Sequence, residues 1–295
     1  MNGIRFATEK DIDELKNLWK ICFGDSDAFI QYYFKEEFKA DRVLLLEDKG
    51  IASMLTMIPI QLSVPNDKKY SGAMLYAVAT HPTFQGKGLS TQLMDYAKSY
   101  LKEQGMNIIT LVPASSSLAD FYAKRGYTTG FYHKESNFSH KELKEYSIHT
   151  DSSFILEVAS PSDYQQVREH YLFNYVYQSY DIDGITYQKK LSLLSLCDIY
   201  LIRNQQDLIG CAIIEKLDNN ELFIKELLVP KEAIMPVMKS ISNIFPSNQY
   251  HLRLPIDIGE GMGGITKAFG MYQLLNSHLS QYFKDGNEYL GIAYD

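Results

Sequence analysis

The chain has 295 residues, of which 45% are hydrophobic and 22% charged, and its formal net charge is −7. The length favours two domains, because one hydrophobic core rarely grows beyond about 250 residues. The negative charge argues against a nucleic-acid partner. No membrane-length apolar run and no apolar signal core occur, so we expect a cytoplasmic protein without a membrane partner. The scattered Cys22, Cys197 and Cys211 lack metal spacing, so we expect no metal site.

The first half begins with alternating strand and helix signals. A short strand over residues 4–6 is followed by an amphipathic run from residue 12, which a polar Thr-Glu-Lys-Asp opening predicts to be a capped helix. Two apolar segments, 41–46 and 50–56, read as strands around a turn. A further apolar strand covers 74–79. This alternation predicts an α/β unit with a mixed sheet.

The second half repeats the order of these signals. A strand over 154–158 precedes a capped helix over 164–175, and strands over 198–202 and 208–214 follow around a turn. Both halves then reach a strand that ends in proline, at Pro82 and Pro230. The repeat predicts an α/β fold of two tandem units.

A polar segment separates the two copies. Residues 140–153 are rich in lysine and glutamate, which is typical of a charged linker or a solvated face. We therefore predict one domain over residues 1–145 and a second over residues 146–295.

A glycine-containing loop follows the last strand of the first half. Gly86, Lys87 and Gly88 lie between His81-Pro82 and an amphipathic helix that opens at about Leu89. Amides at a helix N-terminus lack intrahelical partners and favour anions, and glycines let a phosphate approach the backbone. Strand, loop and helix start therefore predict a cradle for a pyrophosphate.

The second half has no such loop. Only Lys231 and Glu232 separate Pro230 from the next helix, and Glu232 would repel a phosphate. We infer that only the first half binds an anionic cofactor.

Two segments of the first half resemble signatures of one superfamily. Residues 85–90, Gln-Gly-Lys-Gly-Leu-Ser, fit the pattern Gln/Arg-x-x-Gly-x-Gly/Ala, with Ser90 in the final position. Residues 118–127, Leu-Ala-Asp-Phe-Tyr-Ala-Lys-Arg-Gly-Tyr, follow an apolar strand over 108–112. Together they resemble motif A and the closing motif of the GCN5-related N-acetyltransferase (GNAT) superfamily. The tandem arrangement, with a degenerate second unit, is similar to enhanced-intracellular-survival acetyltransferases without their sterol-carrier domain.

The resemblance implies that acetyl-CoA is the cosubstrate. The strand end would pair with the pantetheine arm, and the loop and helix start would hold the pyrophosphate. Ser115 departs from the asparagine that many members carry, which puts that cofactor contact in doubt. The implied cofactor-binding residues are Val78, Ala79, Thr80, Gln85, Gly86, Lys87, Gly88, Leu89, Ser90, Thr91 and Ser117.

The resemblance also implies two catalytic residues. Tyr122 occupies the position of the family's general acid, which protonates the departing thiolate. An aromatic core stripe explains the same tyrosine. The chain ends in Asp295 after what reads as a short apolar strand over 290–294, so its carboxyl groups would serve as the base through water. A frayed terminus is the alternative.

The implied activity is direct transfer of an acetyl group to a primary amine. Tyr32, Tyr33 and Glu36 lie in the region that borders the acceptor in the family, and they suit a small cationic amine, an aminoglycoside-like molecule or a protein amine. A solvated helix face explains them equally well. A non-catalytic acyl-CoA-binding regulatory module is the alternative function, and a homo-oligomer is compatible with either.

Overall fold

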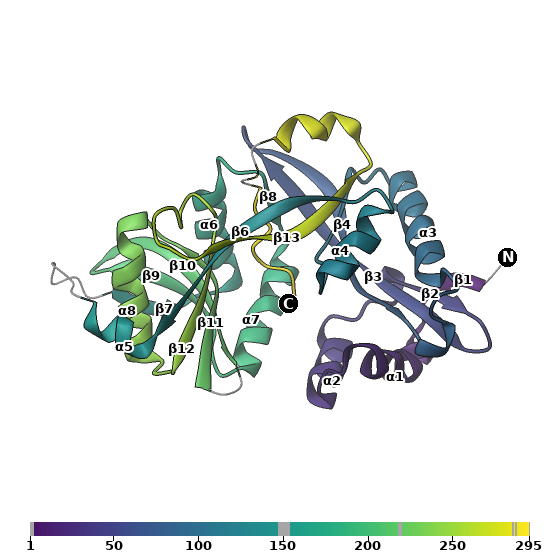
Figure 1. Ribbon diagram of the computed structural model, residues 1–295, viewed down its shortest axis with the longest axis horizontal. Helices are drawn as coiled ribbons and strands as arrows, with labels where there is room; N and C mark the ends of the chain where they lie inside the picture. The colour runs from purple at the N-terminus through teal and green to yellow at the C-terminus, as the bar shows by residue number, and fades with distance from the viewer. Residues whose placement is uncertain (1–2, 147–153, 218–219, 285, 287, 295) are drawn as a thin grey trace. The chain divides into compact units, whose positions relative to one another are not determined.

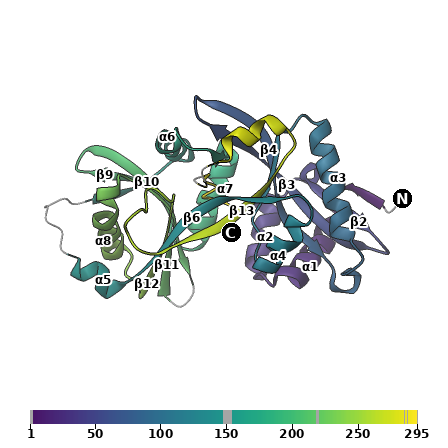
Figure 2. The same cartoon turned by 45° about the horizontal axis from the view of Figure 1, so that its top comes forward.

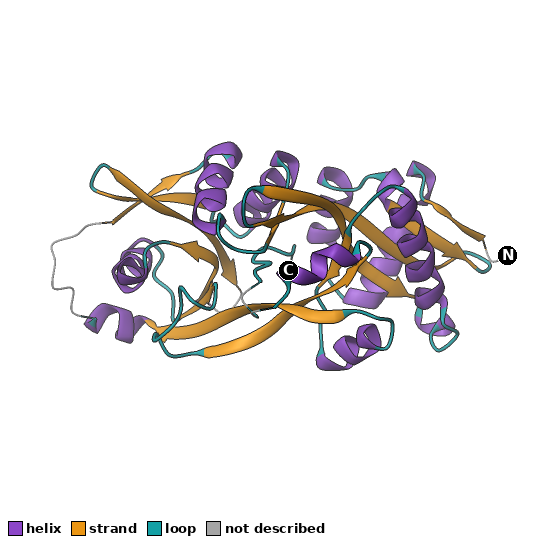
Figure 3. Ribbon diagram, turned by 90° about the horizontal axis from the view of Figure 1, so that it is seen from above, coloured by secondary structure: helices purple, strands orange, loops and turns teal. Residues whose placement is uncertain are grey.

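The computed structural model describes residues 3–146, 154–217, 220–284, 286 and 288–294. They divide into two compact units. The first contains the chain up to residue 62, residues 70–129 and residues 270–281, and the second contains residues 63–69, 130–269 and the chain from residue 282. Each unit combines strands with covering helices, which is a mixed α/β architecture (Figure 3).

The first unit is built on a mixed sheet. Adjacent strands β1–β2 and β2–β3 are antiparallel, whereas β4 and β5 are parallel, and β13 is antiparallel to β5. The helix α3 that joins β4 to β5 is the crossover that a parallel pair requires. The sheet order is β1 (Gly3–Phe6), β2 (Val43–Glu47), β3 (Ile51–Val64), β4 (Lys68–Thr80), β5 (Ile108–Leu111) and the last part of β13 (Ile265–Leu274).

Helices cover both faces of this sheet. On one face, α3 (Leu89–Glu103) buries five apolar residues at helical spacing, and it lies beside the strands in both views (Figures 1 and 2). The short α4 (Ser116–Ala123) joins the same apolar cluster through Tyr122.

The other face carries α1 (Ile12–Phe23) and α2 (Asp27–Glu36). Adjacent residues of β4 show the division, because Leu75 packs in the α3 cluster whereas the Tyr76 ring lies 5.7 Å from that of Trp19 in α1. Successive strand residues point to opposite faces, so α1 and α3 cover opposite sides of the sheet.

The second unit repeats the order of the first unit's main strands and helices, with β11 and β12 as its parallel pair. Its strand order is β6-β12-β11-β10-β9-β7, and β6 is antiparallel to β12. The predicted tandem repeat is confirmed. The elements, in chain order, are β6 (Thr128–Ser139), β7 (Phe154–Val158), α6 (Pro161–Leu172), β8 (Tyr177–Ser179), α7 (Ile182–Leu194), β9 (Ile199–Asn204), β10 (Asp207–Leu217), β11 (Glu221–Leu228), α8 (Ile234–Ile244) and β12 (Gln249–Leu254).

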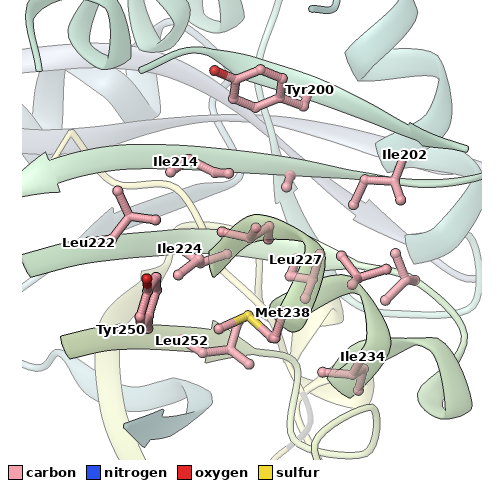
Figure 4. Packing of buried hydrophobic residues seen from close by; sticks show 14 of the residues in the cluster. Tyr200, Ile202, Ile214, Leu222, Ile224, Leu227, Ile234, Met238, Tyr250 and Leu252 are labelled. Atoms are coloured by element: carbon pink, nitrogen blue, oxygen red, sulfur yellow. The ribbon is translucent and has the colours of Figure 1, made fainter. Parts of the chain in front are cut away.

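One core lies between α8 and the second sheet. Ile234 and Met238 of α8 face the apolar residues of β10, β11 and β12, which Figure 4 shows from close by. The amphipathic α8 therefore takes the place that α3 has in the first unit.

The units exchange strands. β13 follows β12 in the chain, yet its last residues pair with β5 of the first unit, and β6 follows the first unit's α4 yet pairs with β12. One boundary between the units therefore falls at residues 129/130, and residues 270–281 belong to the first unit. The sequence predicted a single boundary at 145/146.

One local prediction agrees with the structure and another differs from it. Residues 140–145 form the helix α5 (His140–Glu145), which begins with a reciprocal capping box of Ser139 and Glu142. Its lysines and glutamates are exposed, as expected of a solvated face, and Leu143 is the one buried residue of this helix. The remainder of that segment, 147–153, lies outside the described residues. Residues 290–294 form no strand, and Tyr289 makes only a single parallel bridge, to Tyr177. Non-repetitive backbone in this stretch replaces the expected strand.

Candidate functional site

The end of β4 separates from β5. Their parallel register covers only Gly72 to Met74, and three residues later Ala77 takes a left-handed φ of 50° inside the strand. This irregularity re-aims the last residues of β4.

Beyond Ala77, β4 remains hydrogen-bonded to β3. The Ser53 hydroxyl donates to the Ala79 carbonyl at 2.6 Å, and the His81 amide donates to the Ala52 carbonyl at 2.9 Å. Backbone groups alternate sides along a strand, so those of Val78 and Thr80 face away from β3. The strand thus presents an edge to which an extended amide-containing chain can pair.

The loop after β4 has the form of an anion cradle. Gly86 and Gly88 have φ of 76° and 75°, and a Cβ built on either would meet nothing within 4 Å. The first ladder bond of α3 runs from the Gln92 amide to the Gly88 carbonyl. The amides before Gln92 therefore precede the helical ladder and can point at a ligand.

Side chains hold the loop in place. Gln85 donates from Nε2 to the Thr80 carbonyl at 3.2 Å, which fastens the loop to the strand end. The Lys87 ammonium lies 4.8 Å from the centre of the Phe84 ring, a cation–π contact that keeps its charge beside the glycines. Thr91 belongs to the first turn of α3.

Arg125 is a residue that the sequence reasoning missed. Its Nε donates to the Thr91 hydroxyl at 2.8 Å and its Nη1 to the Phe121 carbonyl at 2.7 Å, while its guanidinium carbon lies 3.3 Å from the centre of the Phe121 ring. These contacts hold the positive charge of Arg125 beside the first turn of α3. The only sequence signal was a basic residue within the closing motif, since Thr91 lies 34 positions earlier.

Tyr122 is held by apolar packing. It is 7% exposed and shares one cluster with Leu89 of α3 and Val78 of β4, and its ring centre lies 5.9 Å from that of Tyr127. Burial raises the pKa of the Tyr122 hydroxyl above its ordinary value of 10.0, and the nearby Arg125 charge lowers it in part. The phenol is therefore protonated at neutral pH and suited to donate a proton.

Ser115, which stands where many members of the GNAT superfamily have asparagine, lies at the start of α4. Ser115 is the N-cap, and its hydroxyl accepts from the Leu118 amide at 3.3 Å and lies 2.9 Å from the Ser117 hydroxyl. Ser117 itself is exposed in the first turn. Ser115 thus caps α4 through its hydroxyl.

The three predicted acceptor residues of α2 do not act as a group. Tyr33 is 1% exposed, and its ring centre lies 4.5 Å from that of Trp19, so it has a packing role. Tyr32 and Glu36, one helical turn apart, are partly exposed on another side of the helix. Burial, with the Glu36 charge second, raises the pKa of the Tyr32 hydroxyl. Glu36 also pairs with Lys35 at 3.1 Å.

Asp295 lies outside the described residues, but the segment before it is ordered by packing. Tyr289, Leu290, Ile292, Ala293 and Tyr294 are all buried within the second unit. A frayed end therefore does not describe residues 289–294.

The described residues lack both a membrane-spanning helix and a metal-binding cluster. None of their helices is long and apolar enough to cross a membrane. No group of three or more His, Cys, Asp or Glu side chains in this part of the chain could hold a metal ion.

Known proteins resemble this chain in sequence and in fold. Residues 3–130 match a family model described as an acetyltransferase (GNAT) domain. A curated protein of Prochlorococcus marinus, named an uncharacterized N-acetyltransferase ycf52-like, is 38% identical over 56 residues. That match covers 19% of this chain and 31% of the relative.

Solved structures show the same fold over nearly the whole chain. A GCN5-related N-acetyltransferase from Anabaena variabilis aligns with a TM-score of 0.77 at 16% identity, covering 94% of this chain and 73% of that one. Eis1 from Mycobacterium abscessus aligns with a TM-score of 0.67 at 13% identity, covering 92% and 74%. The chain therefore has a tandem GNAT fold.

Proposed function

We propose that this chain is an acetyl-CoA-dependent N-acetyltransferase that moves the acetyl group directly to a primary amine. One observation carries the proposal: within the first unit, the open edge of β4 leads into a left-handed glycine loop at the start of α3, beside the buried Tyr122. An edge for a pantetheine amide, a cradle for a diphosphate and a phenol acid are the parts that this transfer needs.

The cosubstrate contacts follow from the chain's own groups. Val78 offers its backbone groups and Thr80 its amide to the pantetheine arm, with Ala79 between them bonded back to β3. The amides of residues 86–91 bind the diphosphate, Lys87 and Arg125 supply positive charge, and Ser117 at the start of α4 adds a hydroxyl.

The chemistry needs one proton removed and one delivered. The amine must lose a proton to attack the thioester carbonyl, and we assign that base to the carboxyl groups of Asp295, acting through water. When the C–S bond breaks, Tyr122 donates its hydroxyl proton to the departing thiolate. The raised pKa of Tyr122 keeps that proton available.

The acceptor in this proposal is a small, cationic primary amine. Tyr32 and Glu36 support it, because an aromatic face and a carboxylate on one side of α2 attract an ammonium group. An aminoglycoside-like molecule or a protein amine shares this chemistry.

Thiol release tests the function. The full chain is incubated with acetyl-CoA and a thiol-reactive dye against polyamines, aminoglycosides and amino-acid amides, while calorimetry measures acetyl-CoA binding. We expect binding, and amine-dependent thiol release with at least one class. Tight binding without release across the panel would instead indicate a regulatory acyl-CoA-binding module, and no binding heat would contradict both functions.

A further inference from the structure

The second unit contains the counterpart of the β4–β5 opening. β11 and β12 pair in parallel from Glu221 to Ile224 and no further, and Ile224 and Leu252 mark the end of that register in Figure 4. The register with β10 shifts between Ile213 and Ile214, so Lys225 is the extra residue of a bulge.

The two openings correspond residue by residue. Lys225 lies five positions before Pro230, as Ala77 lies five before Pro82, so Glu226 occupies the position of Val78. In the first unit this position borders the proposed pantetheine site.

The chain's own C-terminal segment lies against this opening. A Cβ built on Gly291 would stand 2.4 Å from Oε1 of Glu226 on β11. Arg253 on β12 donates from Nη1 to the Gly291 carbonyl at 3.2 Å. Residue 291 therefore contacts both strands just beyond the point where their pairing ends.

Neighbouring carbonyls of the segment are bonded by other side chains. Arg168 donates from Nη2 to the Leu290 carbonyl at 3.4 Å, and the Tyr180 hydroxyl donates to the Ile292 carbonyl at 2.6 Å. The Tyr294 ring stacks on Tyr180 with centres 5.7 Å apart. Side chains thus bind three successive carbonyls of a tight turn, in which the Ile292 amide donates to the Leu290 carbonyl at 2.9 Å and Gly291 has a left-handed φ of 70°.

A buried ion pair underlies this contact. Glu226 and Arg168 are both fully buried, and Glu226 accepts from the Arg168 Nε at 2.8 Å and from the Tyr164 hydroxyl at 2.5 Å. The Arg168 guanidinium also donates to the Gln178 carbonyl at 3.1 Å. A buried pair with these additional bonds has a defined geometry, so it can hold a peptide in one register.

We propose that the second unit uses its cosubstrate-type opening to bind residues 288–294 of its own chain, with Arg168, Glu226 and Arg253 as positioning residues. The opening is occupied by peptide and is closed to a second acetyl-CoA. The segment ends beside Asp295, so this peptide site fixes the approach to the proposed base; that consequence rests on the proposed function.

Gly291→Ala is the sharpest test, because the new Cβ meets Glu226 and the Tyr289 ring. Gly286→Ala is the matched control: the two glycines have φ of 70° and 69°, but a Cβ at 286 meets nothing within 4 Å. Hydrogen exchange of residues 288–294 and trimming by a carboxypeptidase report the segment directly, without any need for activity.

We expect Gly291→Ala to raise exchange and trimming at least tenfold, and Gly286→Ala to leave both unchanged. Calorimetry should give one acetyl-CoA per chain in both variants, with unchanged affinity. Native-like protection in Gly291→Ala, or two acetyl-CoA sites in the native chain, would overturn the proposal.

Arg253→Met is a second variant that removes one donor without adding volume beside the segment. It should raise exchange at residues 290–292 in the same way, and protection equal to that of the native chain would count against Arg253 as a positioning residue. A kcat that falls while the KM for acetyl-CoA holds supports the link to Asp295. Loosening with unchanged kcat supports the peptide site and removes Asp295 from the mechanism.

Discussion

Tyr122 combines an apolar environment with a proposed role that requires a proton. Tyr122→Phe keeps the ring and its packing but removes the proton donor, so kcat should fall about 10²- to 10³-fold with acetyl-CoA affinity unchanged. Because the protonated form is active and its pKa lies above 10.0, deprotonation of Tyr122 lowers the native rate only above pH 10. Tyr127→Phe, at a buried neighbour in the same cluster, is the control for kcat–pH profiles. If the kcat of Tyr122→Phe equals that of Tyr127→Phe, Tyr122 is not the acid.

Substitution of Gly88, compared with that of Gly105, distinguishes an effect on ligand binding from backbone strain. Gly88 and Gly105, one at each end of α3, have φ of 75° and 74°, and both have open space at the Cβ position. Alanine at either should therefore cost about 1–2 kcal/mol of unfolding free energy. Only Gly88→Ala places a methyl group in the proposed diphosphate cradle, so it alone should weaken acetyl-CoA binding, by about tenfold, or 1.4 kcal/mol. Thermal unfolding and calorimetry measure the two effects, and equal affinities in the two variants would contradict the cradle.

At the scale of elements, Arg125 joins the first turn of α3 to the last turn of α4. Arg125→Met should raise the acetyl-CoA Kd severalfold at low salt, and this difference should shrink at high salt, because a charge contact with the diphosphate is screened. Lys124→Met, at an exposed neighbour, should leave the Kd and its salt dependence unchanged. Arg125→Lys should recover part of the affinity, since it keeps the charge but loses the fork of donors. A salt-independent loss would assign Arg125 a packing role alone.

Sequence patterns predicted those elements whose structure is determined by residues close together in the chain. The start of α3 at Leu89 follows from two glycines and an apolar period, and each strand of the repeat follows from a short apolar run. The sequence could not predict that Tyr33 is buried whereas Tyr32 is partly exposed, because tertiary packing decides which residues of a helix are covered. The contact of Arg125 with Thr91, and the binding of Gly291 beside Glu226, join residues far apart in sequence, which no local pattern specifies.

At the scale of the whole molecule, strand exchange decides what can fold alone. Met271 to Leu274 pair with Leu111 to Ile108, so the last strand of the first unit's sheet comes from a segment that follows most of the second unit in the chain. Gln273 donates from Nε2 to the Arg125 carbonyl at 3.0 Å, and Asn276 bonds to Asn107 at 3.0 Å. Residues 270–281 therefore complete the GNAT unit next to its candidate site.

A chain truncated after residue 145 tests this dependence. It leaves an edge of β5 unpaired and uncovers apolar surface that Met271 buries, so we expect aggregation or a non-cooperative thermal transition and loss of acetyl-CoA binding. Joining residues 270–281 to the truncated chain through a flexible glycine–serine linker restores the strand without the second unit. Circular dichroism and calorimetry on both chains decide the matter: if the bare 1–145 chain unfolds cooperatively and binds acetyl-CoA as tightly as the full chain, the exchanged strand is dispensable. Recovery only in the linked chain would show that β13, rather than the second unit as a whole, completes the first fold.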